Sequence, residues 1–134
     1  MMTRDIDPKI SVVLALIIIS VFPSLALLLY ETQGYGEDEA IQDAVRFLKS
    51  SPTFRFDGIP GSIRVESAEP LTPGRWRVTL YFECRHSGYG DRSGLILLPV
   101  ITPHRLELII DRGIIEEALI DGFWDELHQR PIGD

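Results

Sequence analysis

The longest apolar run in the chain lies near its N-terminus. Residues 10–30 read ISVVLALIIISVFPSLALLLY, twenty-one residues without a charge. As an α-helix a segment of that length is roughly 31 Å long, which matches the hydrocarbon thickness of a bilayer. The pattern predicts a transmembrane signal-anchor helix over residues 10–30, preceded by a short stub, residues 1–9.

A cleaved signal peptide is the alternative interpretation of this run. Ser24-Leu25-Ala26 has the small-x-small pattern of a cleavage site. Cleavage there would leave the apolar residues Leu27–Tyr30 as a new N-terminus, and the full run fits a membrane span better than a signal core. We therefore expect an uncleaved anchor, and the sequence leaves open whether residues 1–26 are removed.

The charges on either side of the run indicate its orientation. Arg4 and Lys9 flank its N-terminal side, partly offset by two aspartates, and no Lys or Arg occurs from residue 31 to residue 45. The positive-inside bias places the N-terminus in the cytoplasm and the rest of the chain outside the cell membrane.

After a linker, residues 31–36, the pattern changes to that of an amphipathic helix. Over Asp38–Ser50 the apolar positions recur with helical spacing and form one face. Acidic side chains lie in the first turn and Lys49 in the last, as the helix dipole prefers. The apolar positions are Ala40, Ile41, Ala44, Val45 and Leu48.

Alternation of apolar and polar positions then predicts strands. The clearest is Arg75–Arg85, where every second residue from Trp76 to Cys84 is apolar. The other expected elements are a brief alternation at Thr53–Ile59, strands at Ser62–Ala68, Leu95–Ile101, His104–Ile110 and Ile114–Ile120, and a helical turn at Phe123–Gln129. Together they predict an α+β domain over residues 37–130, with one helix across a four- to five-stranded antiparallel sheet. Residues 131–134 should be loose.

Two resemblances follow from these segments. The helix-then-sheet layout is cystatin-like, and with the closing hairpin HRLELIIDRGIIEEALIDG it is similar to PepSY-type domains, which would imply peptidase inhibition. The stretches SPTFRFDG, CRHSGYGDRSG and ITPH with DGFWDEL resemble a family of small, uncharacterised archaeal membrane-anchored proteins. The second resemblance supports the domain boundaries and implies no activity.

Charge and cysteine content exclude several function classes. The formal net charge is −7, and because residues 1–30 are balanced, the excess acid lies in the domain. An acidic domain without a basic face argues against nucleic acid and against an anionic lipid surface. The single cysteine, Cys84, can form no intrachain disulfide, and its phase in the long strand favours a buried position.

The densest cluster of polar side chains follows the long strand. Glycines at 88, 90 and 94 could let backbone N–H groups converge on an anion, with arginines adding charge. The competing interpretation is a hairpin loop whose glycines supply positive φ and whose aspartate makes an Asx turn. The candidate ligand-binding residues are Arg85, His86, Tyr89, Asp91 and Arg92.

Metal binding and catalysis have weaker signals. Cys84-x-His86 with His104 and Asp91 could ligate zinc or copper. If Leu95–Ile101 pairs with the long strand, however, His104 lies at the end of the sheet far from His86. The acidic residues around Trp124 (Asp121, Asp125 and Glu126) lack the spacing of a calcium loop. There is no G-x-S-x-G motif and the cysteine points inward, so we expect no enzyme, no metal and no cofactor.

The apolar run Leu95–Ile101 instead predicts a surface for a partner. A strand that is apolar on both faces needs both faces covered. The C-terminal segment, a second protomer or another membrane protein could supply the cover. The candidate partner surface is Leu95, Leu97, Leu98, Val100 and Ile101.

We therefore expect a non-enzymatic single-pass membrane protein. Its extracytoplasmic domain would bind a protein partner or a second copy, or serve as an accessory subunit of a membrane complex. The alternatives are a small anion or metal sensor that uses residues 85–92, and a PepSY-like peptidase inhibitor. The identity of the partner or ligand and the oligomeric state stay open.

Overall fold

The computed structural model describes residues 7–32 and 34–133, and it describes residues 20–22 and 24–32 as backbone only. The chain divides into two units, Met1–Gly34 and Tyr35–Asp134. The first unit contains helix α1 (Pro8–Thr32), which covers the whole apolar run. A search limited to the described residues finds no helix that combines the length and the apolar character of a membrane span. Most of the predicted stub lies outside the described residues.

The second unit begins with the predicted amphipathic helix, α2 (Glu37–Ser50). Its buried residues are Ala40, Ala44 and Leu48, so the apolar face is as expected. The Gly36 N–H donates to the Glu39 carboxylate over 3.0 Å, which satisfies one of the free N–H groups at the start of the helix.

The alternation at Thr53–Ile59 does not form a strand. Residues 52–57 form a second short helix, α3 (Pro52–Asp57), and a 3-10 turn, η1 (Pro60–Ser62), follows. Pro52 occupies the first helical turn, where its fixed φ favours a helix and its missing N–H costs nothing. Thr53 and Phe54 are buried against the sheet, which a strand alternation at these residues does not predict.

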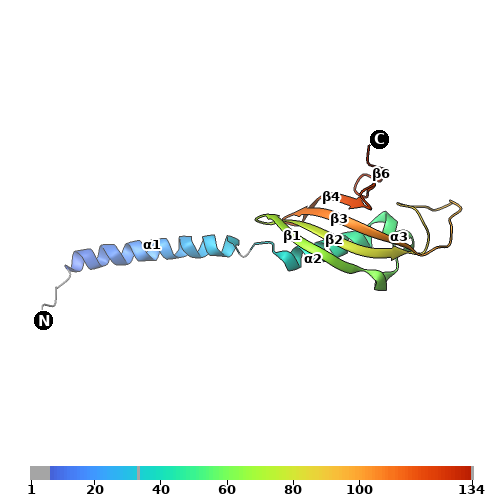
Figure 1. The fold of residues 1–134 in the computed structure, drawn as a ribbon. Helices are drawn as coiled ribbons and strands as arrows, with labels where there is room; N and C mark the ends of the chain where they lie inside the picture. Colours follow the sequence, from blue (N-terminus) through green and yellow to red (C-terminus); the bar gives the residue numbers. More distant parts are fainter. Residues whose placement is uncertain (1–6, 33, 134) are drawn as a thin grey trace. The chain divides into compact units, whose positions relative to one another are not determined.

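The sheet is antiparallel, with its strands in sequence order (Figure 1). They are β1 (Arg64–Thr72), β2 (Arg75–Cys84), β3 (Thr102–Asp111), β4 (Ile114–Ile120), β5 (Trp124–Asp125) and β6 (Arg130–Pro131). The α+β class and the antiparallel sheet are confirmed, but there are six strands rather than four or five.

The additional strands come from the segment that we expected to be a helical turn. The Asp125 carboxylate accepts the N–H groups of Leu127 and His128, and Gln129 has a φ of 53°, so the chain turns sharply here. Residues 124–125 and 130–131 pair as a small hairpin. The Ile132 N–H donates to the Phe123 carbonyl, so residue 132 is held rather than loose.

The predicted strand Leu95–Ile101 is also wrong. These residues form an irregular, exposed loop, and β3 begins only at Thr102. Pro99 has no N–H to donate to a ladder, and Gly94 has a φ of 81°. Consequently His104 pairs with Phe82, near the same end of β2 as His86 and not at the opposite end.

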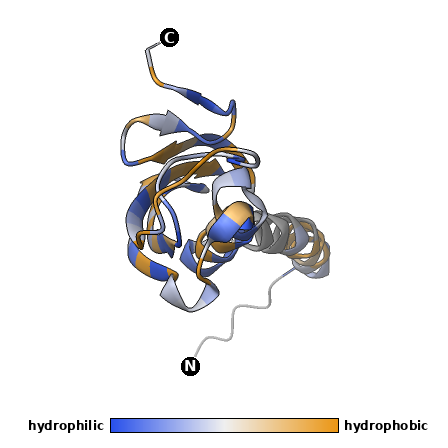
Figure 2. Ribbon diagram, turned by 90° about the vertical axis from the view of Figure 1, so that its right-hand side faces the viewer, coloured by the Kyte–Doolittle hydropathy of each residue, from blue (hydrophilic) through white to orange (hydrophobic). Residues whose placement is uncertain are grey.

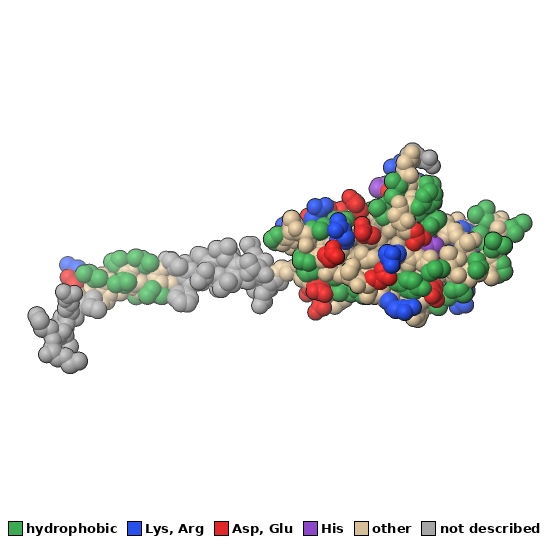
Figure 3. Space-filling model, viewed as in Figure 1, with side chains coloured by type: hydrophobic (Ala, Val, Ile, Leu, Met, Phe, Trp, Pro, Cys, Tyr) green, Lys and Arg blue, Asp and Glu red, His purple; other side chains and the backbone are tan. Residues whose placement is uncertain are grey.

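Alternating positions along the strands separate a core face from a solvated face (Figure 2). The core consists of residues from α2, α3 and the inner face of the sheet: Ala40, Ala44, Leu48, Phe54, Val78, Leu80, Phe82, Cys84, Leu106, Leu108, Ile110, Ala118 and Ile120. The opposite face carries ion pairs that join Arg75 to Glu116, Arg77 to Glu69 and Glu107, and Arg105 to Glu66. Figure 3 shows acidic and basic side chains interspersed on the surface of the domain. Because that face is polar, it needs no covering layer.

Candidate functional site

The loop between β2 and β3, residues 85–101, is held to α3 by one buried arginine. Arg92 is only 2% exposed. Its guanidinium donates to Asp57 Oδ1 over 2.8 Å, to the Thr53 carbonyl over 3.0 Å and to the Gly88 carbonyl over 2.8 Å. The Phe56 ring lies 4.7 Å from the guanidinium carbon. Arg92 is therefore engaged inside the domain and does not face solvent as a free anion ligand.

Asp57 extends the same contact to His86. Its Oδ2 accepts the His86 N–H over 2.7 Å and lies 2.9 Å from the His86 Nδ1. The Cys84 side chain is buried nearby, and its S–H donates to the Thr53 carbonyl at 3.8 Å. Burial raises the pKa of Cys84 to about 12, and the Asp57 carboxylate adds to the rise. This thiol is protonated at neutral pH, which is the opposite of an activated nucleophile.

A second buried contact fixes the middle of the loop to α3 and to the C-terminal segment. Glu126, 2% exposed, accepts the Thr53 N–H over 2.8 Å, the Thr53 hydroxyl over 2.7 Å and the Trp124 indole N–H over 2.8 Å. The Thr53 hydroxyl oxygen accepts the Gly90 N–H over 2.7 Å. Gly90 has a φ of 68°, and a Cβ there would lie 3.2 Å from Trp124. Glycine is therefore required where the loop meets the indole ring.

Aromatic rings continue this packing to β3. Tyr89 stacks on Trp124 at a centroid distance of 5.7 Å and lies 5.3 Å from His104. Its hydroxyl donates to Asp121 over 3.0 Å, and His104 Nδ1 lies 2.7 Å from the same carboxylate. Burial opposes ionisation of Asp121, but hydrogen bonds from His104, from the Arg105 N–H and from Tyr89 outweigh it and lower the Asp121 pKa. Burial, with Asp121, raises the pKa of Tyr89 to about 12.

The structure does not assemble the residues that we considered as metal ligands. His86 contacts Asp57, whereas His104 contacts Asp121, and Cys84 faces Thr53. Within residues 7–32 and 34–133 no group of three or more His, Cys, Asp and Glu side chains is arranged to hold a metal ion.

Of the five candidate ligand residues, His86, Tyr89 and Arg92 are engaged by other parts of the domain, whereas Arg85 and Asp91 are exposed. Asp91 accepts the Ser93 N–H over 3.0 Å in an Asx turn, and its pKa is lowered by the hydrogen bonds from Ser93. Glycines 88, 90 and 94 all have positive φ. These features confirm the interpretation as a glycine-rich loop with an Asx turn, while anion binding by this loop stays a prediction.

The other half of the loop exposes apolar side chains. We call residues 94–101 the apolar segment. Leu97 is half-buried, and the other large side chains are Leu95 at 65% exposure, Ile96 fully exposed, Leu98 at 71%, Val100 at 51% and Ile101 at 54%. No charged residue occurs from Ser93 to Pro103. Single exposed apolar residues are ordinary, but a contiguous group is typical of a binding surface.

Sequence reasoning missed the residues that hold this loop in place, namely Thr53, Asp57 and Glu126. Asp57-Gly58 has the pattern of a turn, and Glu126 that of a solvated carboxylate. The only signal was the arginine in a glycine-rich loop, which needs an acidic partner if it is buried. That partner is 35 residues away, so no local pattern reveals it.

A scan against protein-family models, a search of curated proteins and a search of solved structures each gave no match.

Proposed function

We propose that this chain is a non-enzymatic, single-pass membrane protein whose extracytoplasmic domain binds a protein partner through the apolar segment, residues 94–101. One observation carries the proposal. Five large apolar side chains are exposed on a loop whose preceding residues are fixed by buried polar contacts through Arg92 and Gly90. A loop that is already ordered loses less conformational entropy on binding than a mobile one.

The position of the apolar segment supports a role in binding. The chain enters the domain at Tyr35, whose carbonyl accepts the Trp76 indole N–H at the start of β2. The apolar segment follows the other end of β2 (Figure 1). A strand of ten residues is about 33 Å long. Tyr35 and the apolar segment therefore lie toward opposite ends of β2.

The character of α1 supports the membrane part of the proposal. The large apolar side chains described from Ile10 to Ile19 are all more than half exposed. A helix that is apolar on all sides is stable only when protein or lipid covers it. With Lys9 at its start and an acidic stretch after it, we propose that it anchors the domain on the outer side of the cell membrane.

The finer description of the fold belongs to this proposal as well. One helix across an antiparallel sheet supports a cystatin-like assignment, but folds of this layout serve unrelated functions. The protonated Cys84 and the histidines paired with separate aspartates support a binding role over catalysis.

Site-specific photocrosslinking in cells tests the proposal with the full chain. A photoreactive residue replaces Ile96, and the matched control replaces Val65, which is 44% exposed on β1. We expect one discrete protein adduct at position 96, none at position 65, and loss of the adduct when Leu95→Ser and Leu98→Ser are added. An adduct of twice the chain mass would indicate a second copy, and an adduct with lipid or no adduct at all would overturn the proposal.

A further inference from the structure

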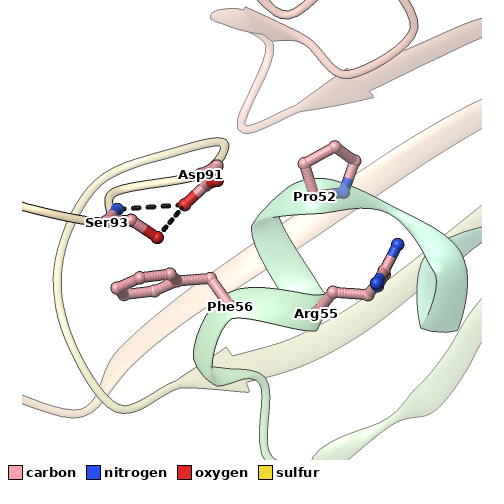
Figure 4. Close-up of a pocket in the computed structure, with 5 residues that line it drawn as sticks. All are labelled: Pro52, Arg55, Phe56, Asp91 and Ser93. Carbon is pink, nitrogen blue, oxygen red and sulfur yellow. Dashed lines mark hydrogen bonds between the residues drawn. The ribbon is translucent and has the colours of Figure 1, made fainter.

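A hollow of about 450 Å³ lies between α3 and the Asp91–Ser93 turn, directly before the apolar segment. Figure 4 shows Phe56 leaving α3 toward Asp91 and Ser93 of the loop, while Arg55 leaves the helix in a different direction. Pro52 completes the lining. The volume is within the range of sites that bind small molecules or single residues of a peptide.

Two opposite charges line this hollow without pairing. Arg55 makes no side-chain hydrogen bond or ion pair with the part of the chain that the structure describes. On the loop, Asp91 Oδ1 accepts two hydrogen bonds from Ser93, while no described residue donates to Oδ2. A cation and an anion that share a hollow but remain more than 4 Å apart can each take a different group of one ligand.

The third element of the hollow is apolar. Phe56 is half-buried, and the Arg92 guanidinium stacks on its ring at 4.7 Å. The ring is therefore fixed in place and offers a flat apolar wall beside Arg55. The chain continues from Ser93 into the apolar segment, so the hollow and the proposed partner surface are adjacent.

We propose that this hollow binds an α-carboxylate whose α-carbon also carries an N–H donor and an apolar side chain. Arg55 pairs with the carboxylate, Asp91 Oδ2 accepts the N–H, and Phe56 contacts the side chain. This chemistry belongs both to the C-terminal residue of a polypeptide and to a free amino acid. For a polypeptide C-terminus the inference rests on the proposed function, because the remainder of that partner would cover the apolar segment.

The charges of the hollow favour a ligand of this class over a simple ion. A simple anion would be attracted by Arg55 but repelled by Asp91, which the Ser93 hydrogen bonds keep ionised. A simple cation would be attracted by Asp91 but repelled by Arg55. Guanidinium and carboxylate form paired, charge-assisted hydrogen bonds, so the carboxylate end of the ligand fixes its orientation.

NMR titration of the ¹⁵N-labelled full chain in detergent micelles tests the site. The probes are N-acetyl-leucine, leucine and N-acetyl-leucinamide, which has no carboxylate. We expect saturable shifts at residues 52–56 and 91–93 with the two carboxylates and none with the amide. The substitution Arg55→Gln should weaken binding at least tenfold. The control Arg85→Gln removes an exposed arginine of the β2–β3 loop that does not line the hollow, and it should leave binding unchanged.

Comparison of leucine with N-acetyl-leucine also identifies the source of the carboxylate. Tighter binding of leucine, lost in Asp91→Asn, indicates a free amino acid, whereas binding of N-acetyl-leucine that equals or exceeds that of leucine indicates a polypeptide C-terminus. No saturable shift with either carboxylate, or equal losses in Arg55→Gln and Arg85→Gln, overturns the inference. If neither carboxylate probe binds but the photocrosslinked adduct at position 96 still forms, only the inference is overturned. If the probes bind and the adduct is absent, only the proposed function falls.

Discussion

Arg92 is the residue on which the order of the β2–β3 loop depends. An arginine that is 2% exposed has lost its hydration, and its charge is balanced by the Asp57 carboxylate, itself only 6% exposed. The backbone carbonyls of Thr53 and Gly88 satisfy further donors. A buried ion pair stabilises the folded state little more than apolar side chains of similar volume would. Removal of one member, however, leaves a buried charge without that partner.

The first prediction follows from this contact. Arg92→Met should destabilise the domain by about 3–5 kcal/mol, because Asp57 stays buried without its guanidinium partner and keeps only its contacts with His86. Arg105→Met removes an exposed ion pair with Glu66, which water screens, and should cost far less. Denaturant unfolding of the solubilised full chain, followed by tryptophan fluorescence, measures both. Equal losses of unfolding free energy in the two variants would show that the buried Arg92 contact stabilises the domain no more than the exposed ion pair does.

Cys84 gives a second prediction at this scale. A thiol that ionises near pH 12 rather than near 9 contains about a thousandfold less thiolate at neutral pH, and the thiolate is the reactive form. Iodoacetamide should therefore label native Cys84 at least a thousandfold more slowly than an exposed thiol. The control is Ser50→Cys in a Cys84→Ala chain, since Ser50 is exposed at the end of α2. Comparable labelling rates at the two positions would contradict the burial of Cys84.

Asp121 gives a third prediction, which concerns the pH dependence of stability. Its pKa is lower in the folded chain than in the unfolded chain, where it is near 3.8. Its contribution to stability is therefore complete above that value and is lost as the pH falls below it. The difference in unfolding free energy between the wild type and Asp121→Asn should shrink steadily below about pH 4. A difference that stays constant down to pH 2 would mean that the contacts with His104 and Tyr89 do not favour the ionised form.

At the scale of elements, the sequence predicts best where burial is one-sided. The alternation in β2 identifies its core face correctly, because Val78, Leu80 and Phe82 are fully buried and the residues between them are not. The same reliance on apolar positions gives a wrong prediction for the apolar segment. A run of apolar residues indicates a buried strand, and nothing local distinguishes it from apolar side chains left exposed for a partner. Pro99, within this run, argues against a central strand because proline has no N–H to donate to a ladder.

The junction between α3 and β2 offers a prediction about an element. Gly58 forms a β-bridge with Cys84, and a Cβ on Gly58 would lie 2.3 Å from the Phe54 ring. Gly58→Ala should therefore cost about 1–3 kcal/mol by displacing that buried ring. Gly61→Ala is the matched control, because a Cβ there meets nothing within 4 Å. Thermal unfolding of both variants measures the difference, and a neutral Gly58→Ala would show that α3 can shift freely on the sheet.

At the scale of the whole molecule, α1 and the domain have opposite surface chemistry. The apolar stretch of α1 carries no charge between Ile10 and Tyr30, while the domain carries the excess acid of the chain. An acidic domain gains nothing from an anionic lipid surface, so the proposed attachment to a membrane would depend on the apolar helix alone. Whether residues 1–26 are retained would then decide where the β2–β3 loop is located.

The last prediction concerns that attachment. If α1 is an uncleaved anchor, the chain keeps its full mass of 15.1 kDa and sediments with membranes through alkaline carbonate washes. The double substitution Leu16→Arg and Ile19→Arg places two charges in the apolar run, each costing about 2.5–3.5 kcal/mol at the centre of a span, and should release the chain. Leu71→Arg, at an exposed position of β1, should stay bound. A mature chain that begins after Ala26 would identify the run as a signal peptide, and the proposed anchor would be wrong.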